Sequence, residues 1–337
     1  MNIDFIVPWV DGSDENWLLK KRKYEESNDE TIDNSADRYR NWDLLKFWFR
    51  GVERFAPWVH KIFFVSDHQI PTWLNVDHPK LKIVLHEEFI PNKYLPVFSS
   101  HPIELNFHRI SDLSEYFVYF NDDMFLTSEV YPEDFFIKKL PCGLAVESPV
   151  TPEKNDIFNH ILLNDITMIN EKYRRKEVLK KQKRLFYSKK DFKGWAMNKC
   201  LSFLKRDAFF GFEYSHLSSS FLKSSFVELW NEGYDWLDST CSHHFRNIED
   251  VNQYVFLYHQ FVNGNFIPKS WRKFGKAYHI DDSLDGNVKE LCDAIRKQKF
   301  KEVCVNERQV NHFKETQSKV YQAFSELLPQ KSSFENK

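Results

Sequence analysis

The chain has 337 residues, and 42% of them are hydrophobic, enough to bury a full core in one large domain or in two of ordinary size. Its 47 Lys and Arg residues nearly balance 49 Asp and Glu residues, for a formal net charge of −2, so no basic field indicates a nucleic-acid partner. Five scattered cysteines argue against a zinc ribbon or a disulfide framework, and no apolar stretch suits a membrane span or a signal peptide. We therefore expect a cytoplasmic protein that is soluble or peripherally bound to the membrane.

Short apolar runs bounded by polar or turn residues recur in the first part of the chain, a pattern typical of buried strands. These runs cover residues 3–9, 61–65, 81–85 and 116–120. Helical patterns lie between them, over residues 43–55 and 103–110. Because strands alternate with helices, the sequence predicts an α/β fold with a mostly parallel sheet flanked by helices.

A lysine-rich, helix-compatible segment begins at about residue 151. We expect an α/β core over residues 1–150, a basic helical insertion over 151–200, and the remainder of one catalytic domain over 201–337, with a helix near 307–328. The basic run over 172–193 has aromatic residues nearby and could touch anionic lipid, although such a run also suits a solvated helix face.

Polar residues follow three of the predicted strands at the point where each strand ends. In open α/β sheets, ligands bind beyond the carboxyl ends of the strands, where the loops converge. The polar strings are WVDGSD from Trp9, SDHQ from Ser66 and NDD from Asn121. We expect them to share one crevice.

The third string offers two adjacent carboxylates, Asp122 and Asp123, directly after a buried strand. Hard cations such as Mg²⁺ or Mn²⁺ prefer such oxygen ligands together with the phosphate oxygens of a substrate. The alternative is a polar turn at a strand end, since Asn and Asp favour turns.

The first string combines carboxylates, a hydroxyl and a flexible glycine at Asp11, Gly12, Ser13 and Asp14. These groups could hold a ribose or a base edge. The alternative is a helix N-cap, with Ser13 or Asp14 starting the next helix. Neither a G-x-x-x-x-G-K-[ST] nor a G-x-G-x-x-G string occurs, which excludes P-loop and Rossmann dinucleotide sites.

Histidines form two further candidate sites. Glu104 and His108 lie one helical turn apart and would share a face, where Arg109 could bind a phosphate through both of its terminal nitrogens. A structural histidine is the alternative. His216 and the run over residues 243–250 form the second polar concentration, and the absence of H-E-x-x-H excludes a zinc protease.

Four strings occur in a fixed order and span about residues 3–262. They are IDFIVPWVDGSDENW from Ile3, RYRNWDLLKFWFRGVERFAPWVHKIFFVSDHQIPTWL from Arg38, LPVFSSHPIELNFHRISDLSEYFVYFNDDMFL from Leu95 and HHFRNIEDVNQY from His243. The first three resemble the first three conserved regions of Stealth proteins, and the last resembles the fourth. Bacterial members of this family make phosphodiester-linked capsule or exopolysaccharide.

The resemblance implies transfer of a hexose-1-phosphate from a UDP-sugar to a glycan hydroxyl, with release of UMP, on a fold related to the GT-A glycosyltransferases. It implies a Mg²⁺ or Mn²⁺ ion at Asp122 and Asp123. The residues implied for the donor are Trp9, Asp11, Gly12, Asp14, Asp67 and Gln69. The residues implied for catalysis are His108, Arg109, Asp123, His216 and Arg246, with His216 ranked first as general base.

Three positions depart from the family pattern, namely Pro8, His68 and Asn106. The first two could alter the fit of the nucleotide, and the third could shift a proton relay or acceptor contacts. Two other functions stay open: a metal-dependent glycosyltransferase that releases UDP, and a catalytically silent sugar-nucleotide-binding protein of capsule assembly.

Overall fold

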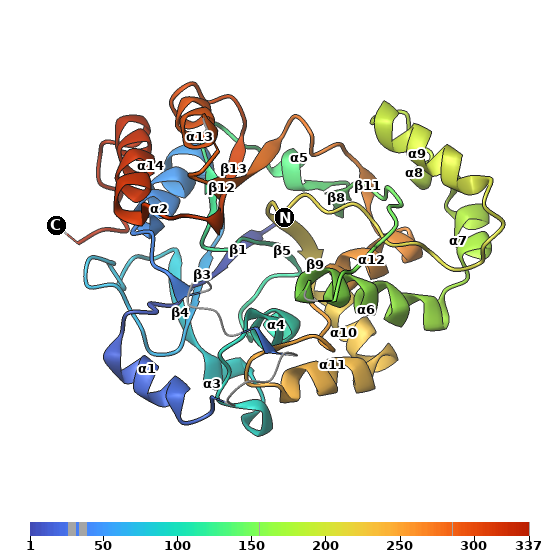
Figure 1. Ribbon diagram of the computed structural model, residues 1–337, viewed down its shortest axis with the longest axis horizontal. Coiled ribbons are helices and arrows are strands. Elements are labelled where there is room, and N and C mark those ends of the chain that lie inside the picture. Colours follow the sequence, from blue (N-terminus) through green and yellow to red (C-terminus); the bar gives the residue numbers. More distant parts are fainter. Residues whose placement is uncertain (26–31, 34–38, 155, 285, 337) are drawn as a thin grey trace.

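The computed structural model describes residues 1–25, 32–33, 39–154, 156–284 and 286–336 (Figure 1). Its centre is a five-stranded sheet with the order β4-β3-β1-β5-β9. The strands are β1 (Ile3–Pro8), β3 (Ile62–Ser66), β4 (Leu81–Leu85), β5 (Tyr116–Tyr119) and β9 (Ser219–Leu222). The first four are parallel to their neighbours, and β9 runs antiparallel to β5 at one edge. The predicted α/β class with a mostly parallel sheet is confirmed.

Each predicted apolar run forms a strand whose ends agree with the prediction to within one residue. The runs are apolar throughout because helices cover both faces of the sheet. Successive side chains point to opposite faces, so Phe5 and Val7 join one core cluster while Ile6 joins the other.

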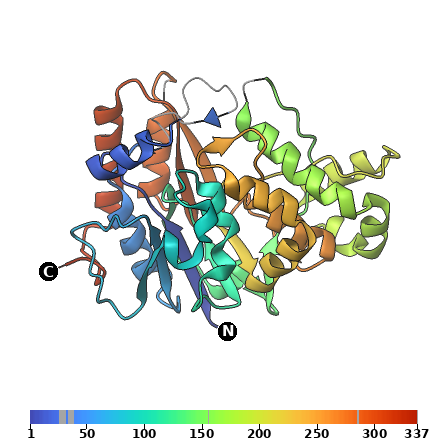
Figure 2. The same cartoon turned by 90° about the horizontal axis from the view of Figure 1, so that it is seen from below.

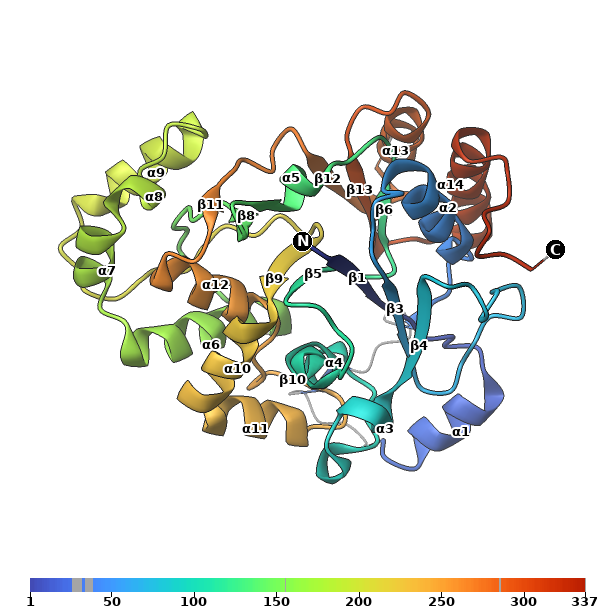
Figure 3. The same cartoon turned by 180° about the vertical axis from the view of Figure 1, so that it is seen from behind.

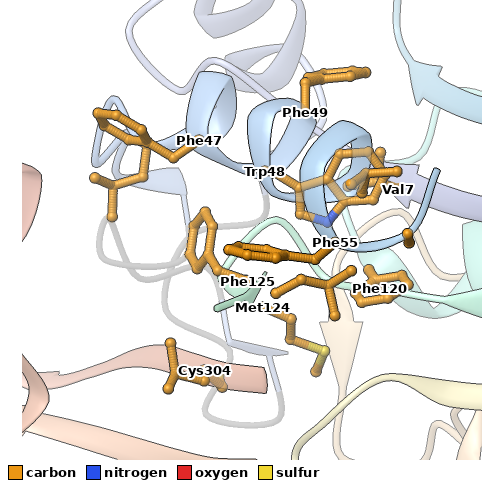
Figure 4. Close-up of a cluster of buried hydrophobic side chains, with 14 of the residues drawn as sticks. Val7, Phe47, Trp48, Phe49, Phe55, Phe120, Met124, Phe125 and Cys304 are labelled. Atoms are coloured by element: carbon orange, nitrogen blue, oxygen red, sulfur yellow. The ribbon is translucent and has the colours of Figure 1, made fainter. Parts of the chain in front are cut away.

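The first core cluster lies between the sheet and one layer of helices. That layer comprises α2 (Leu45–Phe55), α13 (Asn287–Arg296) and α14 (Phe313–Leu327), with a small sheet of β12 (Gly275–Asp281), β13 (Glu302–Gln309) and β6 (Met124–Leu126). Figure 4 shows Trp48 and Phe55 of α2 lying toward Phe120 and Met124. The ring centroids of Trp48 and Phe120 are 5.7 Å apart, so α2 is fixed directly above the end of β5.

The second cluster lies on the opposite face, under a second layer of helices (Figure 2). These helices are α4 (Ser100–Leu105), α6 (Ile157–Lys172), α10 (Lys223–Glu232), α11 (Tyr234–Ser242) and α12 (Tyr254–Asn263). Phe226 of α10 stacks on Phe256 of α12, with 3.6 Å between ring centroids. The stacking locks these two helices together beside β9.

Most of the segment over residues 151–200, predicted as helical, forms helices: α6 is followed by α7 (Arg175–Lys181), α8 (Lys183–Phe186) and α9 (Phe192–Ser202). Helices α7, α8 and α9 lie at the far end of the molecule from α13 and α14 (Figure 1). The boundaries at residues 150 and 200 stay a prediction, since Leu162 and Val178 belong to the same cluster as the sheet. None of the helices described has both the length and the hydropathy needed to cross a bilayer.

Shorter elements connect the layers. They are α1 (Glu15–Arg22), β2 (Ile32–Asp33), α3 (His86–Phe89), η2 (Asn92–Tyr94), η3 (Phe107–Arg109), α5 (Pro132–Phe135), β7 (Phe136–Ile137), β8 (Leu140–Gly143), β10 (Arg246–Asn247) and β11 (Ile267–Pro268).

Two predicted helices are wrong in extent. The helix expected over residues 103–110 begins earlier, and α4 ends at Leu105 because the Asn106 side chain donates a hydrogen bond to the carbonyl of Pro102 and the chain continues as the 3₁₀ helix η3. Glu104 and His108 therefore do not share an α-helical face.

The helix expected over residues 307–328 begins only at Phe313. Residues 302–309 form strand β13, whose branched residues Val303 and Val305 are buried. The start of α14 is fixed by Asp282, which accepts hydrogen bonds from the backbone of Asn311 and His312.

Candidate functional site

The two adjacent carboxylates lie in a tight turn between β5 and β6, at the carboxyl edge of the sheet. Strand β5 ends where Phe120 donates its backbone N–H to Ile6, and the turn closes where Met124 donates to Asn121 over 3.1 Å. Met124 then starts β6 and pairs with Cys304 of β13. The turn is thereby held between the main sheet and the small sheet.

Asp123 has two different carboxylate oxygens. Its Oδ2 lies 3.5 Å from Nε2 of His216 and accepts a hydrogen bond from Sγ of Cys304 over 3.2 Å. Its Oδ1 is buried and has no hydrogen-bond partner in the described structure. Burial alone would raise the pKa of Asp123, but the hydrogen bond and charge of His216 outweigh it and hold that pKa below its ordinary value. Asp123 is therefore an anion with one unpartnered oxygen.

His216 lies in the loop that precedes β9, in the left-handed region with a φ of 46°. Burial acts to lower its pKa, but the hydrogen bond and charge of Asp123 raise it above the ordinary value, and the positive charge of Arg246 opposes them. Arg246 lies in β10, which pairs with β2. The structure thus brings Asp123, His216 and Arg246 into one electrostatic neighbourhood.

Asp122 completes the acidic pair. Loss of hydration and then the charge of Asp123 raise the pKa of its carboxyl group to about 7, although the residue as a whole is exposed. A divalent cation would remove this repulsion. The unpartnered Oδ1 of Asp123 beside a second carboxylate is the oxygen donor set that Mg²⁺ or Mn²⁺ prefers, so these residues fit the predicted metal.

Asp123, His216 and Cys304 also place one ligand atom each within 4.8 Å of one another. A soft metal would need the thiolate of Cys304. Burial and the nearby Asp123 instead raise the pKa of this thiol well above its ordinary value, so it acts as a hydrogen-bond donor to Asp123.

The polar strings after β1 and β3 meet, as predicted. Gln69 accepts a hydrogen bond from the backbone N–H of Asp11 over 2.8 Å and donates one to the Asp11 carbonyl over 2.9 Å. A Cβ at Gly12 would lie 2.1 Å from the carbonyl oxygen of Tyr39, so the close approach of these two segments requires glycine. Trp9 joins the same edge by donating its backbone N–H to Val65.

Asp14 is the N-cap of α1 and accepts a hydrogen bond from the backbone of Trp17 over 2.7 Å, which confirms the capping alternative for this residue. Asp67 forms an ion pair with Lys20 at 2.7 Å. Asp67 also lies near His68 and Glu87, but Lys20 contacts both of its carboxylate oxygens, so ion pairing accounts for this group. The donor-binding roles of these residues stay predictions.

His108 and Arg109 lie against α10 instead. Arg109 lies 4.9 Å from the ring centroid of Trp230 and donates to Asn106 over 2.8 Å. Burial, then the charge of Arg109, lowers the pKa of His108 to about 3, so the imidazole is neutral. In the described structure neither side chain forms a hydrogen bond or ion pair with Asp122, Asp123 or His216.

The run over residues 243–250 is organised around Asp250, whose carboxylate accepts from His101 and from His243, each over 2.7 Å. His244 points elsewhere, with its Nδ1 2.6 Å from the carbonyl oxygen of Pro96. The two adjacent histidines therefore face different partners.

Several residues around the acidic pair were missed from the sequence. Tyr119 donates to Glu104 over 2.8 Å, beneath the turn. Glu302 holds the backbone and hydroxyl of Ser218, two residues after His216, and burial raises the pKa of Glu302 to about 7. Glu302 and Cys304 lie on β13, and the branched residues Val303 and Val305 were the one signal that could have identified this strand.

Two solved structures match the chain with low scores. The apo structure of the WbbM bifunctional glycosyltransferase matches with a TM-score of 0.37 and 10% identity over 96% of this chain and 51% of that one. Apo mouse xyloside xylosyltransferase 1 matches with a TM-score of 0.39 and 11% identity over 91% of this chain and 98% of that one. These scores are low, so the relation to the GT-A fold stays a prediction.

Two family profiles match the first part of the chain: Stealth protein CR1, conserved region 1, at residues 1–29, and Stealth protein CR2, conserved region 2, at residues 38–142. The strings from Arg38 and from Leu95 both lie within conserved region 2, so the assignment of the second of them to a third region is wrong.

Curated relatives match along nearly the whole chain. A capsular polysaccharide phosphotransferase WcwK of Streptococcus pneumoniae is 38% identical over 99% of this chain and 98% of its own length. The receptor polysaccharide phosphotransferase WefC of Streptococcus oralis is 38% identical over 99% of both, and the exopolysaccharide phosphotransferase cps2G of Lactiplantibacillus plantarum is 36% identical over 99% and 96%. The chain therefore belongs to the Stealth family and is a phosphotransferase.

Proposed function

We propose that this chain transfers a hexose-1-phosphate, such as GlcNAc-1-phosphate, from a UDP-sugar to a glycan hydroxyl, with release of UMP, in capsule or exopolysaccharide synthesis. The names of the relatives from S. pneumoniae and L. plantarum support the polysaccharide product. The observation that carries the proposal is the contact between Asp123 and His216, an unpartnered carboxylate oxygen beside an imidazole at the carboxyl edge of the sheet.

In the proposed reaction, an acceptor oxygen forms a bond to the β-phosphorus of the donor, and the bond between that phosphorus and the bridging oxygen breaks. UMP leaves with the bridging oxygen. The proton of the acceptor hydroxyl goes to His216, and a positioned base contributes about 10²–10⁴-fold in rate. Arg246 offsets the negative charge that develops on the transferred group.

Asp122 and Asp123 would hold Mg²⁺ or Mn²⁺, which neutralises the diphosphate and offsets the negative charge that raises the pKa of His216. Asp11 and Gln69 would seat the nucleotide at the ends of β1 and β3. In this proposal His108 and Arg109 position other residues and do not contact the substrate. They pack between α4 and α10, where Arg109 contacts Asn106 and Trp230.

The test is an assay with purified protein, a panel of UDP-sugars, Mg²⁺ and candidate oligosaccharides. We expect UMP in the nucleotide fraction and a phosphodiester resonance in the ³¹P NMR spectrum of the glycan product. Release of UDP with a new glycosidic bond would instead identify a glycosyltransferase, and binding of donor without any release would identify a silent binding protein.

A membrane contact belongs to the same proposal. Phe192 at the start of α9 is 74% exposed and Phe203 at its end is 83% exposed. The lysines around them, Lys189, Lys190, Lys193, Lys199 and Lys205, are all exposed. Exposed aromatics within a basic surface favour the interface of an anionic membrane.

A further inference from the structure

Residues of β9, β8 and α12 line a pocket beside the edge strand β9. Figure 3 shows that β9 lies next to β8 and β11, which form a small sheet with β7. The space between its lining residues is about 700 Å³ when open solvent at the mouth is counted, and no residue of its lining was predicted as part of the site. Its lining includes five serines and six aromatic residues, among them Ser215, Ser219, Ser220, Tyr214, Tyr254 and Trp271.

The pocket shares a wall with the acidic site. Ser215 precedes His216 in the chain, and Ser219 pairs with Tyr119 near the end of β5. The segment over residues 215–218 therefore joins the two sites, because Ser215 and Ser218 line the pocket while His216 between them lies 3.5 Å from Asp123. Tyr254 of the lining is also influenced electrostatically by Asp123.

The order of the strands separates this pocket from the predicted nucleotide site. In the sheet β4-β3-β1-β5-β9, the contact between Asp11 and Gln69 lies at the ends of β1 and β3. The pocket is lined by Ser219 and Ser220 of β9, which lies on the other side of β5 in this strand order. Asp123 and His216 stand between the two.

The charges at the pocket are already balanced. Lys269 forms an ion pair with Asp134 at 2.8 Å, and Glu213 forms one with Arg272 at 2.5 Å. Lys269 and Arg272 are therefore already paired with carboxylates and would not be available to bind a diphosphate. Aromatic faces with hydroxyl groups between them suit a neutral sugar, whose C–H face packs on a ring while its hydroxyls donate and accept hydrogen bonds.

We propose that this pocket binds a neutral hexose or N-acetylhexosamine unit of the acceptor glycan and directs one of its hydroxyls to His216. The acceptor role rests on the proposed function, whereas binding of the sugar does not. Trp271, whose ring centroid lies 4.8 Å from the Arg272 guanidinium, is the main stacking surface for the sugar. Tyr214 and Tyr254 of the lining contact each other, with ring centroids 5.7 Å apart.

The first test measures binding alone, by saturation-transfer NMR with methyl glycosides of common hexoses and N-acetylhexosamines and without any donor. We expect at least one glycoside to bind, Trp271→Leu to weaken it about tenfold, and Trp271→Phe, which keeps an aromatic face, to retain most of the affinity. Trp195→Leu, a half-buried tryptophan of α9 outside the pocket, is the control. Absence of binding to the wild-type chain, or equal affinity of wild type and Trp271→Leu, would overturn the proposal.

The second test uses turnover. Trp271→Leu should raise the KM for the acceptor and leave the KM for the UDP-sugar unchanged. If glycosides bind in the pocket but no phosphodiester forms, the proposed function fails and the sugar site stands. If phosphodiester forms and Trp271→Leu has the acceptor KM of the wild type, the pocket is not the acceptor site and the proposed function stands.

Discussion

Asp123 is the residue on which the proposed chemistry depends, because one of its oxygens faces His216 and the other is unpartnered. Asp123→Asn keeps the shape and removes the charge. We expect a fall in turnover of about 10³-fold or more, since a bound cation contributes several kcal/mol of charge stabilisation. The measurement is the initial rate of UMP release in Mg²⁺, with far-UV circular dichroism to show that the variant is folded.

Asp77→Asn, an exposed acid outside the site, is the matched control and should keep the wild-type rate. Full activity of Asp123→Asn would contradict the metal assignment.

Asp250 is the residue through which the closing polar run is held together. Burial would raise its pKa, but hydrogen bonds from His101 and His243 keep the pKa below its ordinary value. The pKa of an Asp carboxyl group in the unfolded chain is about 3.9. Because the pKa of Asp250 is lower in the folded chain, the ionised carboxylate stabilises the fold at pH values above about 3.9. This stabilisation is lost as the pH falls through the pKa of the folded state.

Asp250→Asn should therefore cost about 3 kcal/mol at pH 7, because it leaves the buried His101 and the half-buried His243 without their anion, and the difference from wild type should shrink below about pH 4. Urea unfolding of both proteins at the two pH values measures it. The neighbouring exposed residue gives the control Glu249→Gln, and a cost that is independent of pH would contradict the ionic account.

At the scale of elements, the insertion is joined to the core by a buried ion pair. Arg175 of α7 donates to both carboxylate oxygens of Glu147, over 2.7 and 2.9 Å, and also to the carbonyl of Leu201 at the end of α9. Burial raises the pKa of Glu147 despite this partner, so the carboxylate depends on Arg175.

Arg175→Met should destabilise the chain by about 3–5 kcal/mol, because an uncompensated charge stays buried, and adding Glu147→Gln should recover a large part of the loss. Guanidinium unfolding at pH 8 of the single and double variants measures both effects. A double variant no more stable than Arg175→Met would show that packing of the arginine stem, and not its charge, holds the insertion.

The strands of the central sheet could be predicted because each is covered on both faces and so reads as an unbroken apolar run, as in residues 62–66. The end of α4 could not, since it is set by one hydrogen bond from Asn106 to the preceding turn. Strand β13 could not be predicted, because its charged residues Glu302, Glu307 and Arg308 interrupt the apolar pattern of a strand. Only its pairing with β12 and β6 accounts for the strand.

The site shows the same division. Asp122 and Asp123 follow their strand directly, so local pattern was enough to propose them. Cys304 and Glu302 reach the site from a strand far along the chain, and only tertiary pairing places them there. His108 and Arg109 are adjacent to each other in the sequence, but the turn after α4 directs them to α10.

At the scale of the whole molecule, the sheet orders the functions along one axis. The predicted nucleotide residues follow β1 and β3, the acidic pair follows β5, and the proposed acceptor pocket is lined by β9 at the edge of the sheet. The basic helices α7, α8 and α9 lie on the β9 side of the molecule (Figure 1). If α9 lies against a membrane, the proposed acceptor pocket is therefore nearer to the lipid, and the predicted nucleotide residues are farther from it.

This arrangement predicts binding to anionic vesicles that depends on both charge and aromatic insertion. Phosphatidylglycerol vesicles should sediment the wild-type chain, and neutral phosphatidylcholine vesicles should not, since each cation near the surface contributes about 1 kcal/mol. Raising the salt should weaken binding, because the Debye length falls from about 10 Å at 0.1 M to about 3 Å at 1 M. The double variant Phe192→Ser/Phe203→Ser should bind more weakly at every salt concentration, because these side chains are 74% and 83% exposed and the apolar area that they bury in lipid is lost.

Leu19→Ser on α1 is the matched control, since Leu19 is 56% exposed at the other side of the molecule and should not touch lipid. If the double variant and the Leu19 variant sediment like the wild type, the tip of α9 takes no part in binding, and the basic segment is a solvated helix face. Loss of binding in the double variant alone would instead show that the aromatic side chains at the two ends of α9 contact the membrane.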